Sequence, residues 1–529
     1  MADAAVVKTQ SVDIYNSLPV PERLIREEVE DSYVSDVITE MREILDLYKS
    51  YNDGVDFASE GTQGNYVASD HRSKLCKSII DKEARFFLSK TPEVTVTPNG
   101  ETEQDKKTAS TEQDLIDAVL KDNKFGAKLV RAAKDCFIGK RVLAILNFNA
   151  SGVALSFVPS TNFVFETDDT NVDVLQKVVA FIVTRNSANS NARRIYKKKY
   201  EMRNGFCYVE EGIYDGAGNL IKDILGSTKT RFTYIPAVII SNDGLSGNIM
   251  GESEIAQLIQ GEQWYNKLNG ADIDAERKGM NSIIWALDMN PETTKGLSTS
   301  PGSFWDLHSD DNGAEGRTGS LGMLEPGMSY SGALAVTLDR TKKNMYALVD
   351  MPDADNLEMK ITSGKALKAV YWGLIVRCDE KFMTWGPAIE FLAHTILEGV
   401  KLYPESAKPH SEDYSPTGEE YEISVVNQYP ILSDETEEKT VDLGQVQSQV
   451  MSKKAYIKKW LLLNDQEADA ELKQISAEKD MLEMSMMPDM GNPPEGQEGE
   501  DSEEGENPFG GKEGTGAQTT QENPENEEE

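Results

Sequence analysis

Gly-Lys pairs are the residues of this chain that could bind a phosphate group. A P-loop has the pattern Gly-x-x-x-x-Gly-Lys followed by Ser or Thr. In this chain of 529 residues, the pair Gly364-Lys365 is followed by Ala366. The Gly-Lys pairs at 139–140 and 511–512 also lack the Ser or Thr. The sequence therefore predicts no nucleotide-binding loop of this kind.

Metal-ligating and nucleophilic side chains are few and scattered. The histidines stand at positions 71, 308, 394 and 410, and the cysteines at positions 76, 136, 207 and 378. No histidine has a second histidine four residues later, and no two cysteines are spaced Cys-x-x-Cys. Zinc sites depend on such short spacings. We interpret the histidines as surface or structural residues and the cysteines as reduced thiols.

Acidic residues near position 434 are the remaining candidates for metal chemistry. Asp434, Glu435, Glu437 and Glu438 could hold Mg²⁺ for a nuclease. They also stand at the start of a helical pattern, where carboxylates stabilise the helix dipole without a metal. We favour this second interpretation, and expect no metal, no cofactor and no enzymatic activity.

The charge of the chain argues against tight binding to nucleic acid. The net charge is −36, whereas proteins that grip phosphates do so through clustered Lys and Arg. Contact with nucleic acid should be loose or repulsive, although the charge could also serve solubility alone. Residues 487–529 are acidic and almost without apolar side chains, so we expect a disordered tail that brief proteolysis removes.

No segment has the features of a membrane span or a secretion signal. The longest apolar run covers residues 178–183, far short of the ~18 residues of a spanning helix. The first residues lack the basic and then apolar layout of a signal peptide. We interpret residues 178–183 as a buried strand.

The periodicity of apolar residues predicts helices on either side of a set of short strands. Helical spacing appears at 34–48, 66–88 and 115–137, with a strand at 93–98 and a loop at 99–111. The period then changes, and strands are expected at 142–148, 153–158, 163–166, 178–184, 194–202, 206–211, 220–225 and 231–235. An antiparallel meander flanked by helices makes an α+β body.

Residues 251–368 organise the rest of the chain. A helical pattern at 252–277 is followed by a Gly, Pro, Ser and Thr-rich excursion at 280–329. A second helical pattern covers 330–349, and an acidic loop covers 350–362. This order predicts a protrusion, in which the chain goes out along one helix and returns along the other.

A third and longer helical pattern begins at Gly364 and leads toward the end of the chain. Gly386-Pro387 lies inside it, and we expect a sharp kink or break within one turn of Pro387. A strand is expected at 421–430. Three short helices should follow, with Asp434, Ser452 and Asn464 as their N-caps.

Four motifs resemble one known family in their order and spacing. Residues 85–92 resemble its helix-into-strand junction, and residues 251–268 the start of its first stem helix. Residues 362–367 resemble the opening of its long wing helix, and residues 428–454 its passage from strand to crown. Over most of residues 30–480 the chain is similar to the portal, or head–tail connector, proteins of tailed double-stranded DNA bacteriophages.

The resemblance implies an α+β fold with portal architecture: a wing, a helical stem, a small α/β clip and a helical crown. The implied domains are N-terminal helices and β-rich wing 1–250, first stem helix 251–279, clip 280–329, second stem helix 330–349, tunnel loop 350–362, long kinked wing helix and return strand 363–430, crown 431–486 and disordered acidic tail 487–529.

The resemblance also implies a function. The family forms a ring, usually of twelve subunits, at one vertex of the virus capsid. A terminase motor packages double-stranded DNA through the channel, the DNA later leaves by it, and adaptors bind the ring. Implied partners are copies of the chain, the terminase, adaptors, major capsid and scaffolding proteins and non-specifically bound DNA, with no membrane. The protein would belong to the virion and be assembled in the host cytoplasm.

Two other functional classes stay open from the sequence. The chain could be another self-assembling virion protein, such as an adaptor, baseplate or scaffold component. It could also be a metal-dependent nuclease, which Mg²⁺-dependent DNA cleavage would reveal.

The resemblance assigns roles to particular residues. Stem residues expected to pack against a neighbouring subunit are Ile255, Leu258, Ile259, Tyr265, Leu268, Leu334 and Leu338, although an ordinary core helix fits the same pattern. The basic residues Arg340, Lys342 and Lys343 fit a solvated face slightly better than a ring around DNA.

Two further sets of residues receive implied roles. In the clip, Trp285, Phe304 and Trp305 would contact other subunits, an adaptor or the terminase, because the region is too small for its own core. The tunnel loop would line the narrowest part of the channel with Asp350, Asp353, Asp355, Glu358 and Lys360. A plain surface loop is the alternative.

Overall fold

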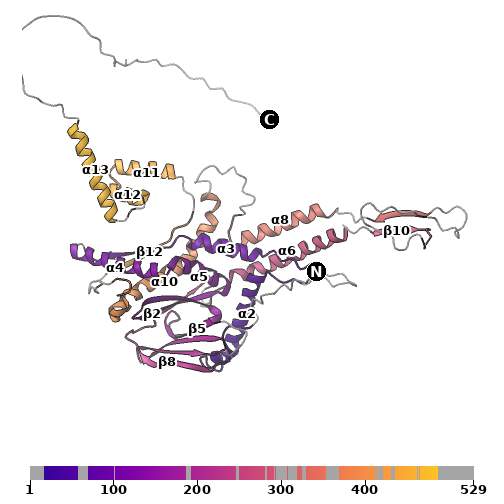
Figure 1. The fold of residues 1–529 in the computed structure, drawn as a ribbon, viewed down its shortest axis with the longest axis horizontal. Helices are drawn as coiled ribbons and strands as arrows, with labels where there is room; N and C mark the ends of the chain where they lie inside the picture. The colour runs from indigo at the N-terminus through magenta and orange to yellow at the C-terminus, as the bar shows by residue number, and fades with distance from the viewer. Residues whose placement is uncertain are drawn as a thin grey trace, which may run out of the picture. The chain divides into compact units, whose positions relative to one another are not determined.

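The computed structural model describes residues 17–57, 69–100, 102–185, 192–242, 244–245, 250–290, 292, 307, 319–324, 329–352, 368–411, 414, 421–430, 435–461, 463 and 465–485, except 280–282. These residues form two units, one up to Glu435 and one from Thr436 onward, which are described separately (Figure 1). Residues 353–367, which include most of the predicted tunnel loop 350–362, and the tail beyond 485 lie outside the described residues.

The described residues before Arg141 form five helices: α1 (Glu22–Arg26), α2 (Val34–Asp53), α3 (Leu75–Leu88), α4 (Glu103–Asp122) and α5 (Phe125–Gly139). The prediction of a loop at 99–111 is wrong. Thr102 and Asp105 form a capping box that starts α4 at Glu103. The predicted single helix at 115–137 is also divided, because Lys124 adopts a left-handed conformation with φ of 52°.

Two antiparallel sheets form the β-rich part of the first unit. One has the order β3-β2-β9, with β2 (Arg141–Asn149), β3 (Gly152–Pro159) and β9 (Ala237–Ser241). The other has the order β4-β5-β6-β7-β8, with β4 (Phe163–Thr167), β5 (Leu175–Arg185), β6 (Arg194–Arg203), β7 (Phe206–Tyr214) and β8 (Leu220–Lys229). The predicted antiparallel strands from 142 to 225 are confirmed.

The predicted strand at 231–235 is wrong, and the strand in this part of the chain is β9, after Pro236. Phe232 and Ile235 are buried in the core. The backbone N–H of Arg231 donates to the hydroxyl of Tyr403 at 2.9 Å, so this segment is held by contacts outside any ladder.

A two-stranded sheet joins distant parts of the chain. Strand β1 (Glu93–Pro98) pairs antiparallel with β12 (Tyr421–Val426), and Val96 lies opposite Ile423. Both strands are predicted by the sequence, but their pairing is not. The pairing of β1 with β12 fixes residues 421–426 next to the junction that follows α3. The chain leaves the first unit shortly after these residues.

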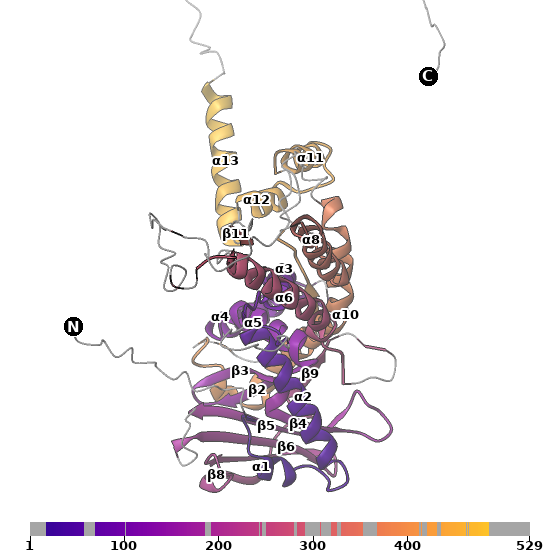
Figure 2. The same cartoon turned by 90° about the vertical axis from the view of Figure 1, so that its right-hand side faces the viewer.

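The predicted outgoing and returning helices are α6 (Glu254–Gly279) and α8 (Ser331–Leu348). They lie side by side in both views, and we call them the stalk (Figure 1, Figure 2). Between them, β10 (Ile283–Leu287) and β11 (Ser320–Leu324) pair as an antiparallel hairpin.

The long helix α10 (Trp372–Leu402) runs through Pro387 without interruption. The predicted break is therefore wrong, while a kink without a break stays a prediction. Proline removes one backbone hydrogen bond, the one to the carbonyl of Met383. Met383 is exposed, so water can solvate that carbonyl. A short 3-10 turn, η4 (Pro404–Ser406), follows α10.

The second unit is helical, with α11 (Glu435–Gln447), α12 (Lys453–Leu461) and α13 (Asp465–Ser485). The predicted cap at Ser452 is confirmed, since its hydroxyl accepts a hydrogen bond from the N–H of Ala455 at 3.1 Å. The caps predicted at Asp434 and Asn464 lie outside the described residues.

The largest hydrophobic core of the first unit centres on aromatic side chains from α3, α5 and α10. Phe87 packs edge-on against Trp385, with ring centroids 5.9 Å apart, and lies 6.1 Å from the ring of Phe137. All three side chains are almost completely buried. These contacts fix α10 against α3 and α5.

Close packing of the stalk depends on Gly261. A Cβ atom at this position would lie 2.7 Å from Cγ of Met345 on α8. Glycine is unfavourable in a helix interior, so its presence in α6 is explained by this close approach.

We predict that Gly261→Ala lowers the free energy of unfolding by about 1–2 kcal/mol, because overpacking against Met345 outweighs the gain in helix propensity. Gly332 at the start of α8 is the matched control, since a Cβ there meets nothing within 4 Å. Gly332→Ala should leave stability unchanged or raise it. Thermal unfolding of the two variants measures the difference, and equal melting temperatures would contradict the packing argument.

Candidate functional site at the base of the stalk

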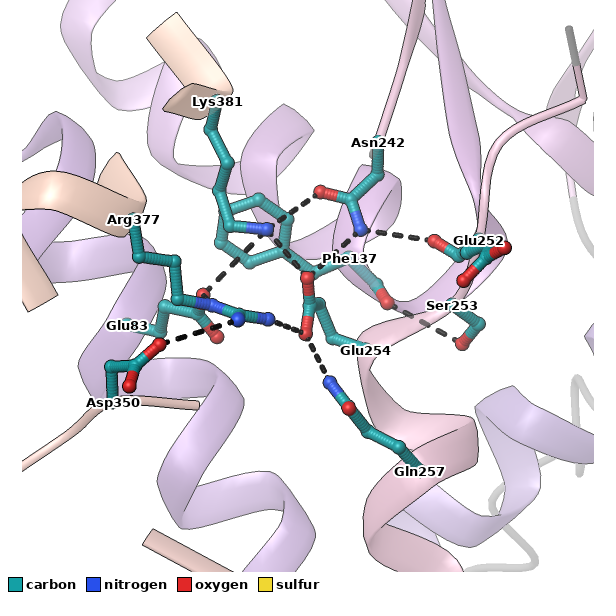
Figure 3. Close-up of polar contacts among 10 residues, drawn as sticks. All are labelled: Glu83, Phe137, Asn242, Glu252, Ser253, Glu254, Gln257, Asp350, Arg377 and Lys381. Atoms are coloured by element: carbon teal, nitrogen blue, oxygen red, sulfur yellow. Dashed lines mark hydrogen bonds and ion pairs between the residues drawn. The ribbon is translucent and has the colours of Figure 1, made fainter. Parts of the chain in front are cut away.

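Buried charged residues meet where the stalk joins the body of the first unit. Glu83 comes from α3, Glu254 from the first turn of α6, and Arg377 and Lys381 from α10 (Figure 3). Asn242 follows β9. We call these five residues the base cluster. Glu83, Glu254 and Lys381 are at most 2% exposed, so this is a buried ionic site.

Glu254 is the centre of the base cluster. Its carboxylate accepts hydrogen bonds from Lys381 and Arg377, each at 2.5 Å, and from Asn242 at 3.1 Å. Gln257, one turn along α6, adds a fourth bond at 2.6 Å. Because carboxylate oxygens need such partners when buried, these bonds fix the first turn of α6 against α10.

Arg377 connects the two helices of the stalk at the base of the stalk. Its guanidinium pairs with Glu83 at 3.3 Å, with Glu254 at 2.5 Å and with Asp350 at 3.7 Å. Asp350 lies just after α8 and has a positive φ of 50°. One side chain of α10 therefore contacts both the start of α6 and the residue after the end of α8 (Figure 3).

The base cluster shifts the pKa values of its two glutamates in opposite directions. Burial and the nearby Glu254 carboxylate raise the pKa of Glu83 to about 7. Burial also acts against ionisation of Glu254, but Lys381 and Arg377 outweigh it and lower its pKa to about 2. With Glu83 protonated, Glu254 still pairs with both cations, and Asp350 pairs with Arg377.

The turn before α6 explains a motif noted in the sequence. Gly251 has a φ of 72°, and a Cβ there would lie 2.5 Å from the carbonyl oxygen of Lys140. The Ser253 hydroxyl donates to the carbonyl of Ile138 at 2.7 Å. Residues 251–254 thus place Glu254 by a tight turn, a hydrogen bond to α5 and the ionic contacts.

Polar side chains of α6 make a second anchor, farther along the stalk. Glu262 accepts from the backbone N–H of Cys76 at 2.7 Å and so caps the start of α3. Asn266 accepts from the N–H of Ser73 at 3.0 Å and donates to the carbonyl of Val55 at 3.1 Å. Glu262 and Asn266 are fully buried.

These contacts explain why α3 begins at Leu75, not at the predicted residue 66. The N–H of Ser69 bonds to Asp274 at 3.0 Å, and Ser73 bonds to Asn266. Residues 69–74 are therefore held along α6 in a non-helical conformation. The prediction failed because the competing partners lie about two hundred residues away in the sequence.

The predicted stem stripe is covered largely within the chain. Ile255 and Leu258 are fully buried, and the other stripe residues are partly buried: Ile259, Tyr265, Leu268, Leu334 and Leu338. Ile255 and Leu258 belong to the hydrophobic core of their own chain, as the alternative of an ordinary core helix expects.

The other predicted site residues are dispersed. Arg340 and Lys343 are exposed on α8, whereas Lys342 is half-buried with its ammonium 6.0 Å from the ring centre of Tyr346. Trp285 on β10 is exposed and packs on Gly322, where a Cβ would lie 2.5 Å from the indole.

The remaining predicted site residues lie either outside the described residues or at the kink site on α10. Phe304 and Trp305, and the tunnel-loop residues Asp353, Asp355, Glu358 and Lys360, lie outside the described residues. At the kink site, Gly386 is buried and Pro387 is exposed on α10.

Sequence reasoning missed the base cluster and the second anchor. A signal was present in α6, where Glu254, Glu262 and Asn266 share the helix with the apolar stripe. Polar residues at core positions of a helix indicate buried partners. No such signal identifies the partners Glu83, Arg377 and Lys381, because their pairing depends on the tertiary fold.

The arrangement can hold and orient helices, but it offers no reactive group to solvent. Among the described residues, no group of three or more His, Cys, Asp or Glu could hold a metal ion. Within the same residues, no helix combines the length and apolar character that crossing a membrane requires. The base cluster and the second anchor hold the helical stalk against the body of the first unit.

Part of the chain matches a known protein family. Residues 330–484, from α8 to the end of α13, match the family model described as phage portal protein, SPP1 Gp6-like. This match, over less than a third of the chain, supports a phage portal protein, and the matched family is structural and not enzymatic. A comparison with curated proteins finds no match.

Neutralising Glu254 should be far more damaging than neutralising Glu83. Glu254→Gln leaves Arg377 and Lys381 short of a buried partner, and we expect it to lower the free energy of unfolding by roughly 3–5 kcal/mol. Glu83→Gln mimics the protonated side chain and should cost about 1 kcal/mol or less. Denaturant unfolding at neutral pH compares them, and equal losses would contradict this assignment.

The pH dependence of stability should separate the two carboxylates. The stability linked to the lowered pKa of Glu254 is present above pH 4.5 and lost as pH falls through about 2. The stability linked to the raised pKa of Glu83 is present below pH 4.5 and lost as pH rises through about 7. As pH rises from 4.5 to about 7, the Glu83→Gln variant should therefore lose less stability than the parent.

Proposed function

We propose that this portal protein forms a dodecameric ring at one vertex of the capsid. The ring would be the channel through which a terminase packages double-stranded DNA and through which the DNA leaves. It would also be the platform for head–tail adaptors, with the major capsid and scaffolding proteins as partners during assembly in the host cytoplasm.

The observation that carries the proposal is the anchored stalk. Arg377 of α10 pairs with Glu254 at the start of α6 and with Asp350 just after the end of α8. The α6–α8 pair is therefore held at a fixed angle to the body. A subunit that contributes one wall segment to a channel needs such a fixed projection. The family match includes α8, α10 and the helices that follow.

The charge of the chain supports passage of DNA without tight binding. A net charge of −36 per subunit repels phosphates, and each additional Lys–phosphate contact would slow sliding. Trp285 at the stalk hairpin is exposed and would face a neighbouring subunit, an adaptor or the terminase.

The assembly can be tested directly. The purified chain should give a native mass close to twelve times that of one subunit, and electron micrographs should show rings with a central channel. A chain that stays monomeric at micromolar concentration would contradict the proposal.

A second test concerns the loop between α8 and α10. Asp353→Lys together with Asp355→Lys should leave rings intact. The variant should package or release DNA more slowly, since a basic collar would hold phosphates. Packaged DNA per particle, measured at equal ring incorporation, compares variant and parent. Equal DNA content and equal release would show that this loop does not face the DNA.

A further inference from the structure

Helix α10 has an uncovered apolar stripe. Trp372, Val376 and Met383 are 65%, 49% and 76% exposed, and Pro387 is exposed as well. Their spacing places all four on one side of the helix over about 22 Å. By the same spacing, Arg377 and Lys381 of the base cluster lie on the opposite side. Large apolar side chains aligned over several exposed turns indicate a docking surface.

Acidic residues interrupt this stripe at its middle. Asp379 and Glu380 are exposed and lie between Val376 and Met383. Asp379 accepts a hydrogen bond from the Tyr429 hydroxyl at 2.6 Å, which holds its carboxylate in place. A complementary partner is therefore apolar toward both ends and basic in the middle.

The outer side of α8 has this complementary pattern. Val336 is 67% exposed, and Ala333 and Ala347 are exposed on the same side. Between the alanines stand the exposed Arg340 and Lys343. This set of residues spans about 21 Å of helix, close to the length of the α10 stripe.

The outer side of α8 is free of the stalk packing. Met345, which packs against Gly261 of α6, lies half a turn away from Val336 around the helix. Lys343 pairs with Asp339 at 2.7 Å, but both side chains stay about half exposed. Such a surface pair contributes little stability, so Lys343 can exchange Asp339 for another carboxylate.

We propose that the outer side of α8 in one copy docks on the α10 stripe of a second copy. Each copy carries the two halves on different helices, so the contact is head-to-tail and can repeat around a ring. The inference rests on the ring assembly of the proposed function. It assigns Arg340 and Lys343 to the carboxylates of a neighbouring subunit, not to DNA phosphates.

Charge reversal and rescue test the contact. Glu380→Lys should lower the fraction of chain in rings roughly tenfold at a subunit concentration where the parent is half assembled, because like charges then meet. The double variant Arg340→Glu, Lys343→Glu should do the same. Combining all three substitutions in one chain restores opposite charges, and ring formation should recover.

Matched controls separate this contact from a general charge effect. Glu43→Lys on α2 and Lys107→Glu on α4 change exposed helical residues away from both surfaces and should assemble like the parent. Trp372→Asp should reduce assembly without lowering the melting temperature of the monomer, because the indole is mostly exposed. Native mass spectrometry reports the ring fraction in each case.

The outcomes distinguish the contact from the proposed function. If the parent forms no rings, the proposed function fails and the contact fails with it. If the parent forms rings and the reversed variants match the controls, the ring stands and the contact is wrong. Loss of rings without recovery in the combined variant would also overturn the pairing of α8 with α10.

Discussion

The ionic bonds between Glu254 and the two cations of α10 are the contact on which the rest of the structure depends. Burying charges costs several kcal/mol per ion unless each is paired, so Glu254, Arg377 and Lys381 have few alternative arrangements. Apolar contacts could hold α6 against α10 equally strongly, but they would tolerate small rotations of one helix relative to the other. Fixed donor and acceptor directions set the angle at which the stalk leaves the body.

The aromatic core and the base cluster stabilise the same helices in different ways. Phe87 and Trp385 bury large apolar side chains between α3 and α10, and this burial stabilises the contact through the hydrophobic effect. Lys381 belongs to both, since its ammonium lies 4.7 Å from the ring centre of Phe137 and also bonds Glu254. Moving the stalk would therefore disturb packing and charge pairing together.

Local patterns in the sequence were enough to predict most strands and helices. Helix α12 begins one residue after its predicted cap Ser452, whose hydroxyl accepts from the N–H of Ala455, because capping is a local interaction. Reasoning failed where distant residues compete. The capping box at Thr102 converted a polar loop to helix, and the bonds from Ser73 to Asn266 kept residues before Leu75 out of α3. The base cluster joins residues from four separate parts of the chain, which no local pattern can reveal.

Helix α10 links the interior of the subunit to its surface. Arg377 and Lys381 project toward the base cluster, whereas Trp372 and Val376 stand on the other side of the same turns, exposed. Rotation of α10 about its axis would break the bonds to Glu254 before the exposed stripe moved far. The buried charges thus hold the stripe in one direction relative to the stalk. Because one helix carries both, the geometry of the projection and the surface offered to other molecules are determined by the same set of bonds.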